Sequence, residues 1–397
     1  MAITNEAVDT EPRQRWVILG VIYLSMLAFA IVFQSVPPVL SLIMADLSLS
    51  HAQGGLLMSF FALPGIIVAI PAGMLADRYS QKAIGLVSLA LMILGPALVA
   101  SGSSLPILAL GRIISGVGAV TFLVVAPQLL VQWFTGREVG IAMGIFNTGM
   151  PLGTILSLNL LSRLAESLDW RASIWLSAGL SLVALVVFAW LFAAAPRRSG
   201  HISPPSEGFF QDIRLVGMPI WLVGAAWGLF NAAVIPVFTF TPDLLKTAGL
   251  GIASAGFLTS LVMWPALVLS PVVGYIIDKI GHKRTIIAVG GLALAALIVW
   301  IPDAAGWVLA LMLVIGVAQA LVPAPIFALP PDVTTPERLG LGFGILSTCL
   351  NIGVVVGPAV AGLMRDVTGT YQASYALMSG FALLVALAML VLARWRG

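Results

Sequence analysis

Long apolar stretches constrain this chain more than any other feature. Twelve of them are 18 to 28 residues long, and about 20 residues let an α-helix cross a 30 Å hydrocarbon core. Inside such a core every backbone N–H and C=O must be bonded within the protein, so each stretch is predicted to be helical. The stretches are 16–40, 52–76, 83–102, 105–132, 139–161, 171–194, 215–241, 252–277, 284–301, 306–330, 339–363 and 372–393. We therefore expect an all-α membrane protein.

The composition argues against several other classes. Only 9% of the 397 residues are charged, against about 25% in soluble domains, and the net charge of +3 does not indicate nucleic-acid binding. The single cysteine, Cys349, excludes an intrachain disulfide. The sequence has no cluster of metal ligands, no nucleophile paired with a base and no phosphate-binding loop. We therefore expect that the protein is not an enzyme and that it binds neither a cofactor nor a metal ion. Its expected partners are membrane lipid and a small-molecule solute.

The basic residues predict how the chain lies in the membrane. An even number of spans puts both termini on one side, where loops and tails carry fourteen Lys and Arg residues, whereas the loops on the other side carry four. Basic residues collect on the cytoplasmic side. Both termini are therefore predicted to be cytoplasmic, and a bacterial inner membrane is the expected location.

A short charged turn occurs twice, after the second and the eighth apolar stretch. Its glycine, acid and lysine recur at a separation of 201 positions: Gly73 and Gly274, Asp77 and Asp278, Lys82 and Lys283. The remaining bases of the two turns are Arg78, Lys279 and Arg284. Such a repeat predicts that the chain consists of two similar halves.

Other residues align at an offset of 200 or 201 positions and extend the repeat over both halves. The pairs are Pro64 and Pro265, Gly116 and Gly316, Gly140 and Gly340, Gly144 and Gly344, Thr148 and Thr348, Ser173 and Ser374, and Gly179 and Gly380. A polar, proline-bearing segment separates the halves. We expect a tail at 1–15, a six-helix bundle at 16–194, a cytoplasmic linker at 195–214 and a second six-helix bundle at 215–397, related by a pseudo-twofold axis along the membrane normal.

The repeated turn resembles the loop motif of the major facilitator superfamily, roughly Gly-x-Leu-Ala-Asp-Arg-x-Gly-Arg-(Arg/Lys). The residues that match are Gly73, Leu75, Ala76, Asp77, Arg78 and Lys82, and the chain departs from the motif at Ser80 and Gln81. Two further segments are similar to family motifs, Arg112 to Gly118 in the fourth stretch and Gly353 to Gly362, with Gly357 and Pro358, in the eleventh. The family carries the latter in helix five of its antiporters, whereas helix five here has a different sequence.

The resemblance implies secondary transport, in which two bundles rock about a central site. Asp77 and Asp278, with Arg78, Lys82, Lys279, Lys283 and Arg284, would then form a cytoplasmic gate that closes when the site opens outward. The alternative is that these charges only end helices and orient the chain. Gly144, Gly357 and Pro358 are candidates for close helix packing or for pivots.

Polar side chains inside spans are candidate solute ligands, because burying them in a membrane is costly. Arg112 is the only charged one; it either binds an anionic solute or bonds the backbone carbonyls of a neighbouring helix, as the family's arginine often does. The amides Gln34, Asn147, Asn231, Gln319 and Asn351 either bind solute or join helices, and Trp227 and Trp264 either line a cavity or face lipid.

No acidic residue is predicted at midspan, and His51, His201 and His282 are all expected in loops. A lone buried arginine among amides favours a small organic solute, in particular an anion, moved by a monomer with or without a coupling proton or other ion. Efflux of drug-like hydrophobic compounds is the alternative, and a receptor or scaffold that transports nothing is a third possibility.

Overall fold

The computed structural model describes residues 12–78, 80–134, 137–192, 217–304, 306–335 and 338–394. Side-chain positions are described within these ranges except at 12–13, 69–78, 137 and 278. Most of the predicted tail at 1–15 and the whole predicted linker at 195–214 lie outside the described residues. The same holds for the side chains of Asp77, Arg78 and Asp278 in the predicted gate.

The first half, as far as the structure describes it, consists of helices. They are α1 (Pro12–Phe33), η1 (Pro37–Val39), α2 (Leu40–Leu47), α3 (His51–Arg78), α4 (Gln81–Ser101), α5 (Leu105–Trp133), α6 (Arg137–Leu156), the π-helical η2 (Ser157–Leu161), α7 (Ser162–Ser167) and α8 (Trp170–Leu191). Together α1, η1 and α2 form one traverse, as do α6, η2 and α7, which gives six traverses in this half.

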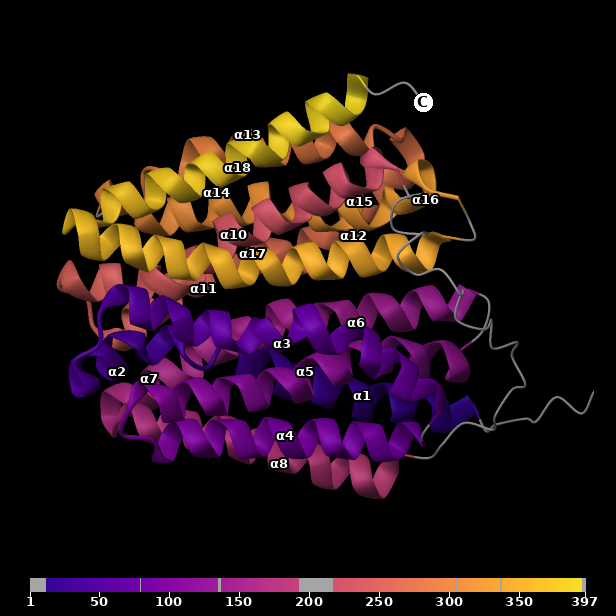
Figure 1. The fold of residues 1–397 in the computed structure, drawn as a ribbon, viewed down its shortest axis with the longest axis horizontal. Helices are drawn as coiled ribbons and strands as arrows, with labels where there is room; N and C mark the ends of the chain where they lie inside the picture. Colours follow the sequence, from indigo (N-terminus) through magenta and orange to yellow (C-terminus); the bar gives the residue numbers. More distant parts are fainter. Residues whose placement is uncertain are drawn as a thin grey trace, which may run out of the picture.

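The second half repeats this arrangement. Its helices are α10 (Met218–Thr247), α11 (Ile252–Ser260), α12 (Met263–Ile280), α13 (Lys283–Ile298), η3 (Ile301–Asp303), α14 (Val308–Ala320), α15 (Pro323–Ala328), α16 (Pro330–Val333), α17 (Leu339–Thr368) and α18 (Tyr371–Arg394). Figure 1 shows the two halves as parallel bundles, with α3 and α6 of the first facing α17 and α12 of the second.

Eleven helical segments of the described chain are long and apolar enough to cross a membrane. The predicted stretch 284–301 corresponds to α13, whose 16 residues span only about 24 Å. It packs along α18 and α14 inside the second bundle and completes six traverses there. The prediction of an all-α protein with two six-helix bundles is therefore confirmed.

Several predicted spans are not single helices. The chain breaks at Gln34–Val36 in the first traverse, at Leu261–Val262 in the eighth, and at Leu321–Val322 in the tenth, and it widens into a π-helix at 157–161 in the fifth. The sequence stays apolar across each of these interruptions. The length of an apolar stretch alone therefore predicts one continuous helix there.

The predicted repeat is visible in matching contacts. A Cβ at Gly116 would lie 2.0 Å from Phe61 O, and one at Gly316 would lie 2.5 Å from Val262 O, with the paired prolines beside them. Likewise Ser173 Oγ donates to Leu161 O at 2.8 Å, and Ser374 Oγ donates to Ala361 O at 2.7 Å. Equivalent residues thus hold equivalent helices together in both halves.

These contacts predict the effect of adding one methyl group. We expect Gly116→Ala and Gly316→Ala each to lower the melting temperature of the purified protein, and Gly116→Ala to have the larger effect because its carbonyl neighbour is closer. Gly179→Ala and Gly380→Ala are matched controls, since neither position has a neighbour within 4 Å. Their melting temperatures should stay unchanged or rise slightly, because alanine favours helix. Equal effects at all four positions would contradict the packing argument.

Candidate functional site

The first traverse is interrupted between α1 and α2 by two prolines. In a continuous helix the N–H groups of residues 37 and 38 would bond the carbonyls of Phe33 and Gln34, but Pro37 and Pro38 have no N–H. The break therefore leaves carbonyl oxygens that must find other donors. One such donor is Ser157, which lies in the π-helical segment. Its Oγ donates to Gln34 O at a distance of 2.7 Å.

Arg112 supplies the others. Its Nη1 donates to Val32 O at 2.9 Å, its Nη2 to Phe33 O at 3.1 Å, and its Nε to Leu57 O at 2.9 Å. The side chain is 1% exposed, and its guanidinium lies 4.5 Å from the centre of the Phe61 ring. One arginine of α5 thus joins the broken end of α1 to α3.

These bonds match the structural alternative considered for Arg112. Three of its five N–H donors bond backbone carbonyls in this conformation, which leaves two without such a partner. Its role as a solute ligand stays a prediction. Its positive charge, however, remains buried within the first bundle.

Gln34 lies in the break itself, not within a helix as the sequence suggested. Its side chain is fully buried, and neither Oε1 nor Nε2 has a hydrogen-bond partner. Buried amides are almost always bonded, so an unpaired amide in a membrane protein points to a missing ligand or water. Of the candidate residues in the first half, Gln34 therefore has the clearest free hydrogen-bonding capacity.

In the second half, α10 and α15 bring aromatic rings together. Trp227 stacks on Phe230 at 5.3 Å between ring centres and meets Phe327 edge-on at 5.2 Å. The Trp227 side chain is 6% exposed, and its Nε1–H has no acceptor. Asn231, one turn later, donates from Nδ2 to Trp227 O at 2.8 Å. An aromatic wall with one unused donor suits an organic solute.

The other two buried amides have neighbours on helices. Gln319 Nε2 is 3.4 Å from Val262 O at the break between α11 and α12, and its Oε1 has no partner. Asn351 Nδ2 donates to Ser347 O at 2.8 Å within α17. A Cβ at Gly65 would lie 2.2 Å from Asn351 Oδ1, so this amide packs directly on α3 of the opposite half.

Asn147 and Trp264 are exposed, Trp264 by 47%. They lie on α6 and α12, which pack against each other across the two halves. An amide on a lipid-facing surface is costly. The position of Asn147 is therefore easier to explain if it faces a water-filled space between the bundles.

Among the gate candidates, Lys283 and Arg284 bond within their own half. Lys283 Nζ is 2.8 Å from Asp332 Oδ2 and 2.8 Å from Ala328 O, and Arg284 Nη1 donates to Leu392 O at 3.0 Å. Lys279 is exposed and Lys82 is half-buried. In this conformation Lys283 and Arg284 therefore hold helices of the second bundle together.

The three packing or pivot candidates differ. A Cβ at Gly357 would lie 2.6 Å from Ala232 O, and Pro358 O would lie 2.2 Å from a Cβ at Gly55. Gly144 has no neighbour within 4 Å, so it does not serve close packing here. Its role as a pivot stays a prediction.

One group of residues was not predicted from the sequence. His51, expected in a loop, is the first residue of α3, and its ring faces two carboxylates of the second half. The sequence around His51 does not indicate this contact, because its acidic partners lie far away in the chain, on α10 and α17.

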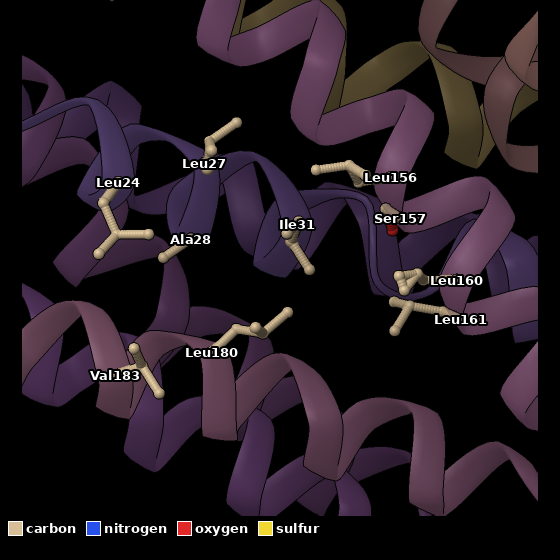
Figure 2. A pocket seen from close by; sticks show the side chains of 10 residues that line it. All are labelled: Leu24, Leu27, Ala28, Ile31, Leu156, Ser157, Leu160, Leu161, Leu180 and Val183. Atoms are coloured by element: carbon tan, nitrogen blue, oxygen red, sulfur yellow. The ribbon is translucent and has the colours of Figure 1, made fainter. Parts of the chain in front are cut away.

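An apolar recess of about 180 Å³ lies elsewhere, on the first bundle between α1, α6, η2 and α8 (Figure 2). It is lined by Leu24, Leu27, Ala28, Ile31, Leu156, Ser157, Leu160, Leu161, Leu180 and Val183. Its one polar side chain, Ser157, already donates to Gln34 O. The recess therefore has no group to orient a polar solute.

The long apolar helices and their arrangement in two pseudo-twofold halves define an integral membrane protein with a transporter fold. The family model of the Major Facilitator Superfamily matches residues 22–254 and 220–396. The chain belongs to this superfamily.

Relatives and solved structures agree with this assignment. The lysosomal dipeptide transporter MFSD1 of Bos taurus is 21% identical (82% of this chain, 74% of the relative), and the hexuronate transporter of Bacillus subtilis is 24% identical (87% and 86%). The probable sulfoacetate transporter SauU of Cupriavidus necator is 24% identical (93% and 91%). A point mutant of the nucleoside transporter NupG has a similar fold, with a TM-score of 0.82, 14% identity and coverage of 95% and 99%.

The unpaired indole of Trp227 yields a prediction that separates binding from stability. We expect Trp227→Phe to keep the ring stacking and the melting temperature, because the lost N–H bonds nothing in the protein. If that N–H binds solute, KM should rise roughly two- to tenfold, the value of one hydrogen bond. Transport in proteoliposomes measures KM.

Trp133→Phe is the matched control. Its Nε1 is also buried without a partner, but it lies at the end of α5. KM should not change in this variant. A lower melting temperature with unchanged KM in Trp227→Phe would contradict a solute-binding role.

Proposed function

We propose that the protein is a secondary transporter that moves a small organic anion by alternating access. The observation that carries this proposal is the buried cation of Arg112 beside the break of α1, where the unpaired amide of Gln34 also lies. A charge held in a medium of low polarity acts over a longer distance than in water. It can therefore favour an anion in the central space even while its N–H groups bond the backbone.

The names of two relatives support an anionic solute. Hexuronate and sulfoacetate are both organic anions, and those transporters match most of this chain. The dipeptide and nucleoside transporters show that the same fold also accepts solutes of other charge. The choice of an anion therefore rests on Arg112 together with these two relatives.

The orientation and the gate complete the proposal. Both termini lie in the cytoplasm, following the excess of basic residues on that side. Asp77 and Asp278, with the bases beside them, close the cytoplasmic side when the site faces outward. The solute binds between α1, α5, α10 and α14, and Trp227 and Gln34 are its first candidate ligands.

A transport experiment tests the charge selectivity. Proteoliposomes containing the full chain should accumulate glucuronate or sulfoacetate in preference to glucose. An anion about 8 Å from Arg112 gains roughly 2 kcal/mol at an effective dielectric constant near 20. Arg112→Met should therefore reduce the preference for the anion by roughly 30-fold.

Arg112→Lys is the matched control. It retains the charge, so it should retain the preference, but it should lower the melting temperature because one ammonium cannot reach carbonyls of both α1 and α3. An unchanged preference in a folded Arg112→Met protein would contradict the role of the charge. If only hydrophobic toxins were moved, efflux would replace anion transport as the function.

A further inference from the structure

A cluster of charged side chains joins the two halves on the side opposite the termini. His51 opens α3 in the first half, Asp243 lies near the end of α10, and Asp366 lies near the end of α17. The His51 Nδ1 atom is 3.0 Å from Asp366 Oδ1, and its Nε2 atom is 3.5 Å from Asp243 Oδ2. Both ring nitrogens of one histidine therefore face carboxylates of the other half.

This geometry suits the protonated ring. Imidazolium has two N–H donors, whereas neutral imidazole has one donor and one lone pair. In either neutral tautomer a lone pair would face a carboxylate oxygen, which is repulsive. The contact between the halves is therefore complete only when His51 carries a proton.

The other groups around His51 hold Asp243 in place and offset part of the negative charge. The Tyr371 hydroxyl donates to Asp243 Oδ2, and the Tyr371 ring meets the His51 ring edge-on at 5.8 Å between centres. Arg365 lies 4.9 Å from the Tyr371 ring centre, and its positive charge partly offsets the two carboxylates. Asp243 is 6% exposed, while a quarter of the His51 side chain is exposed, so a proton can reach the ring from water.

Asp366 has a second task that does not depend on the proton. Its two carboxylate oxygens accept from the backbone N–H groups of His51 at 2.9 Å and Ala52 at 2.8 Å. It thus caps the N-terminus of α3 from the opposite half, where the helix dipole favours an anion. The backbones also touch here, since a Cβ at Gly362 would lie 2.2 Å from His51 O.

The repeat shows which part of this cluster is specific to one junction. Glu166, 200 positions before Asp366, approaches the N-terminus of α11, where its Oε1 would lie 2.7 Å from a Cβ at Gly251. Both junctions therefore place an acid at a helix N-terminus of the other half. The counterpart of His51, 201 positions later, is Ile252. Of these two equivalent positions, only the first carries a side chain that binds a proton near neutral pH.

We propose that His51, with Asp243 and Asp366, forms a proton-binding site that holds the side opposite the termini closed. This inference rests on the proposed function, in which that side faces outward. Protons from the outside then bind Nδ1 or Nε2 of His51 and favour the conformation described here. Loss of the proton weakens the junction and favours opening.

The test measures the distance between the halves as a function of pH. In the full chain with Cys349→Ser, spin labels at Ala45→Cys on α2 and Ala248→Cys after α10 report on this junction, because both positions are exposed and flank it. We expect a short distance to dominate at pH 5.5. The population with the longer distance should grow roughly two- to fivefold by pH 8.5, as for a partly exposed ion pair.

The matching variants locate the response. His51→Gln should remove the pH dependence, and His51→Asn serves the same purpose if the glutamine variant does not fold. His282→Gln is the control, since this exposed histidine bonds Ile280 O beside it and should leave the response intact. A wild-type pH response in folded His51→Gln or His51→Asn would overturn the proposal. So would a distance between the two labels that does not change with pH in the protein that retains His51.

Transport assays on the same proteins separate the two proposals. If the protein transports organic anions but the distance between the spin labels does not change with pH, only the proposed proton-binding site is contradicted. A pH-responsive junction in a chain that moves no solute contradicts the transport assignment alone.

Discussion

The bonds from Arg112 to the carbonyls at the break of α1 are the interaction on which the first half depends. A carbonyl left unbonded in hydrocarbon costs several kcal/mol, so a helix interrupted by Pro37 and Pro38 needs donors from elsewhere. One guanidinium serves α1 and α3 together, which fixes the break relative to its neighbours. At the equivalent position of the second half, 200 residues later, stands Met312. The two halves share an architecture but not this charge, so the proposed preference for an anion would originate in the first half.

The contacts between the halves are of another kind. Along α3 and α17 the backbones approach at glycines such as Gly55 and Gly362, which leaves little side-chain interdigitation to separate there during a rocking motion. Polar contacts then join the halves towards the side opposite the termini, where Lys246 Nζ donates to Ser41 Oγ at 3.2 Å and Asn159 Nδ2 to Ser260 Oγ at 3.0 Å. Smooth backbone contact with a few separable polar bonds suits an interface that opens and closes.

The sequence predicted the fold well because its signals are local. Apolar length predicts spans, and residues such as Gly116 and Gly316 reveal the repeat without knowledge of any contact. The breaks at Gln34 and at Val262 could not be predicted in this way, because hydropathy does not change there and the compensating donors come from distant helices. For the same reason sequence reasoning left Arg112 with two alternative roles, and it placed His51 in a loop although its carboxylate partner Asp366 is 315 residues away.

Contacts inside a half and contacts between the halves differ in energy. This difference explains how each bundle can stay rigid while the two bundles move relative to each other. Bonds inside a half, such as that from Arg112 to Leu57 O, are fully buried, and breaking them would leave unpaired groups at a cost of several kcal/mol. The ion pairs of His51 are partly exposed, and such pairs contribute only about 0.2–1 kcal/mol. Water can replace them when the halves separate. Opening the junction therefore costs much less than deforming either bundle, and a single proton on His51 is enough to shift the balance between closed and open.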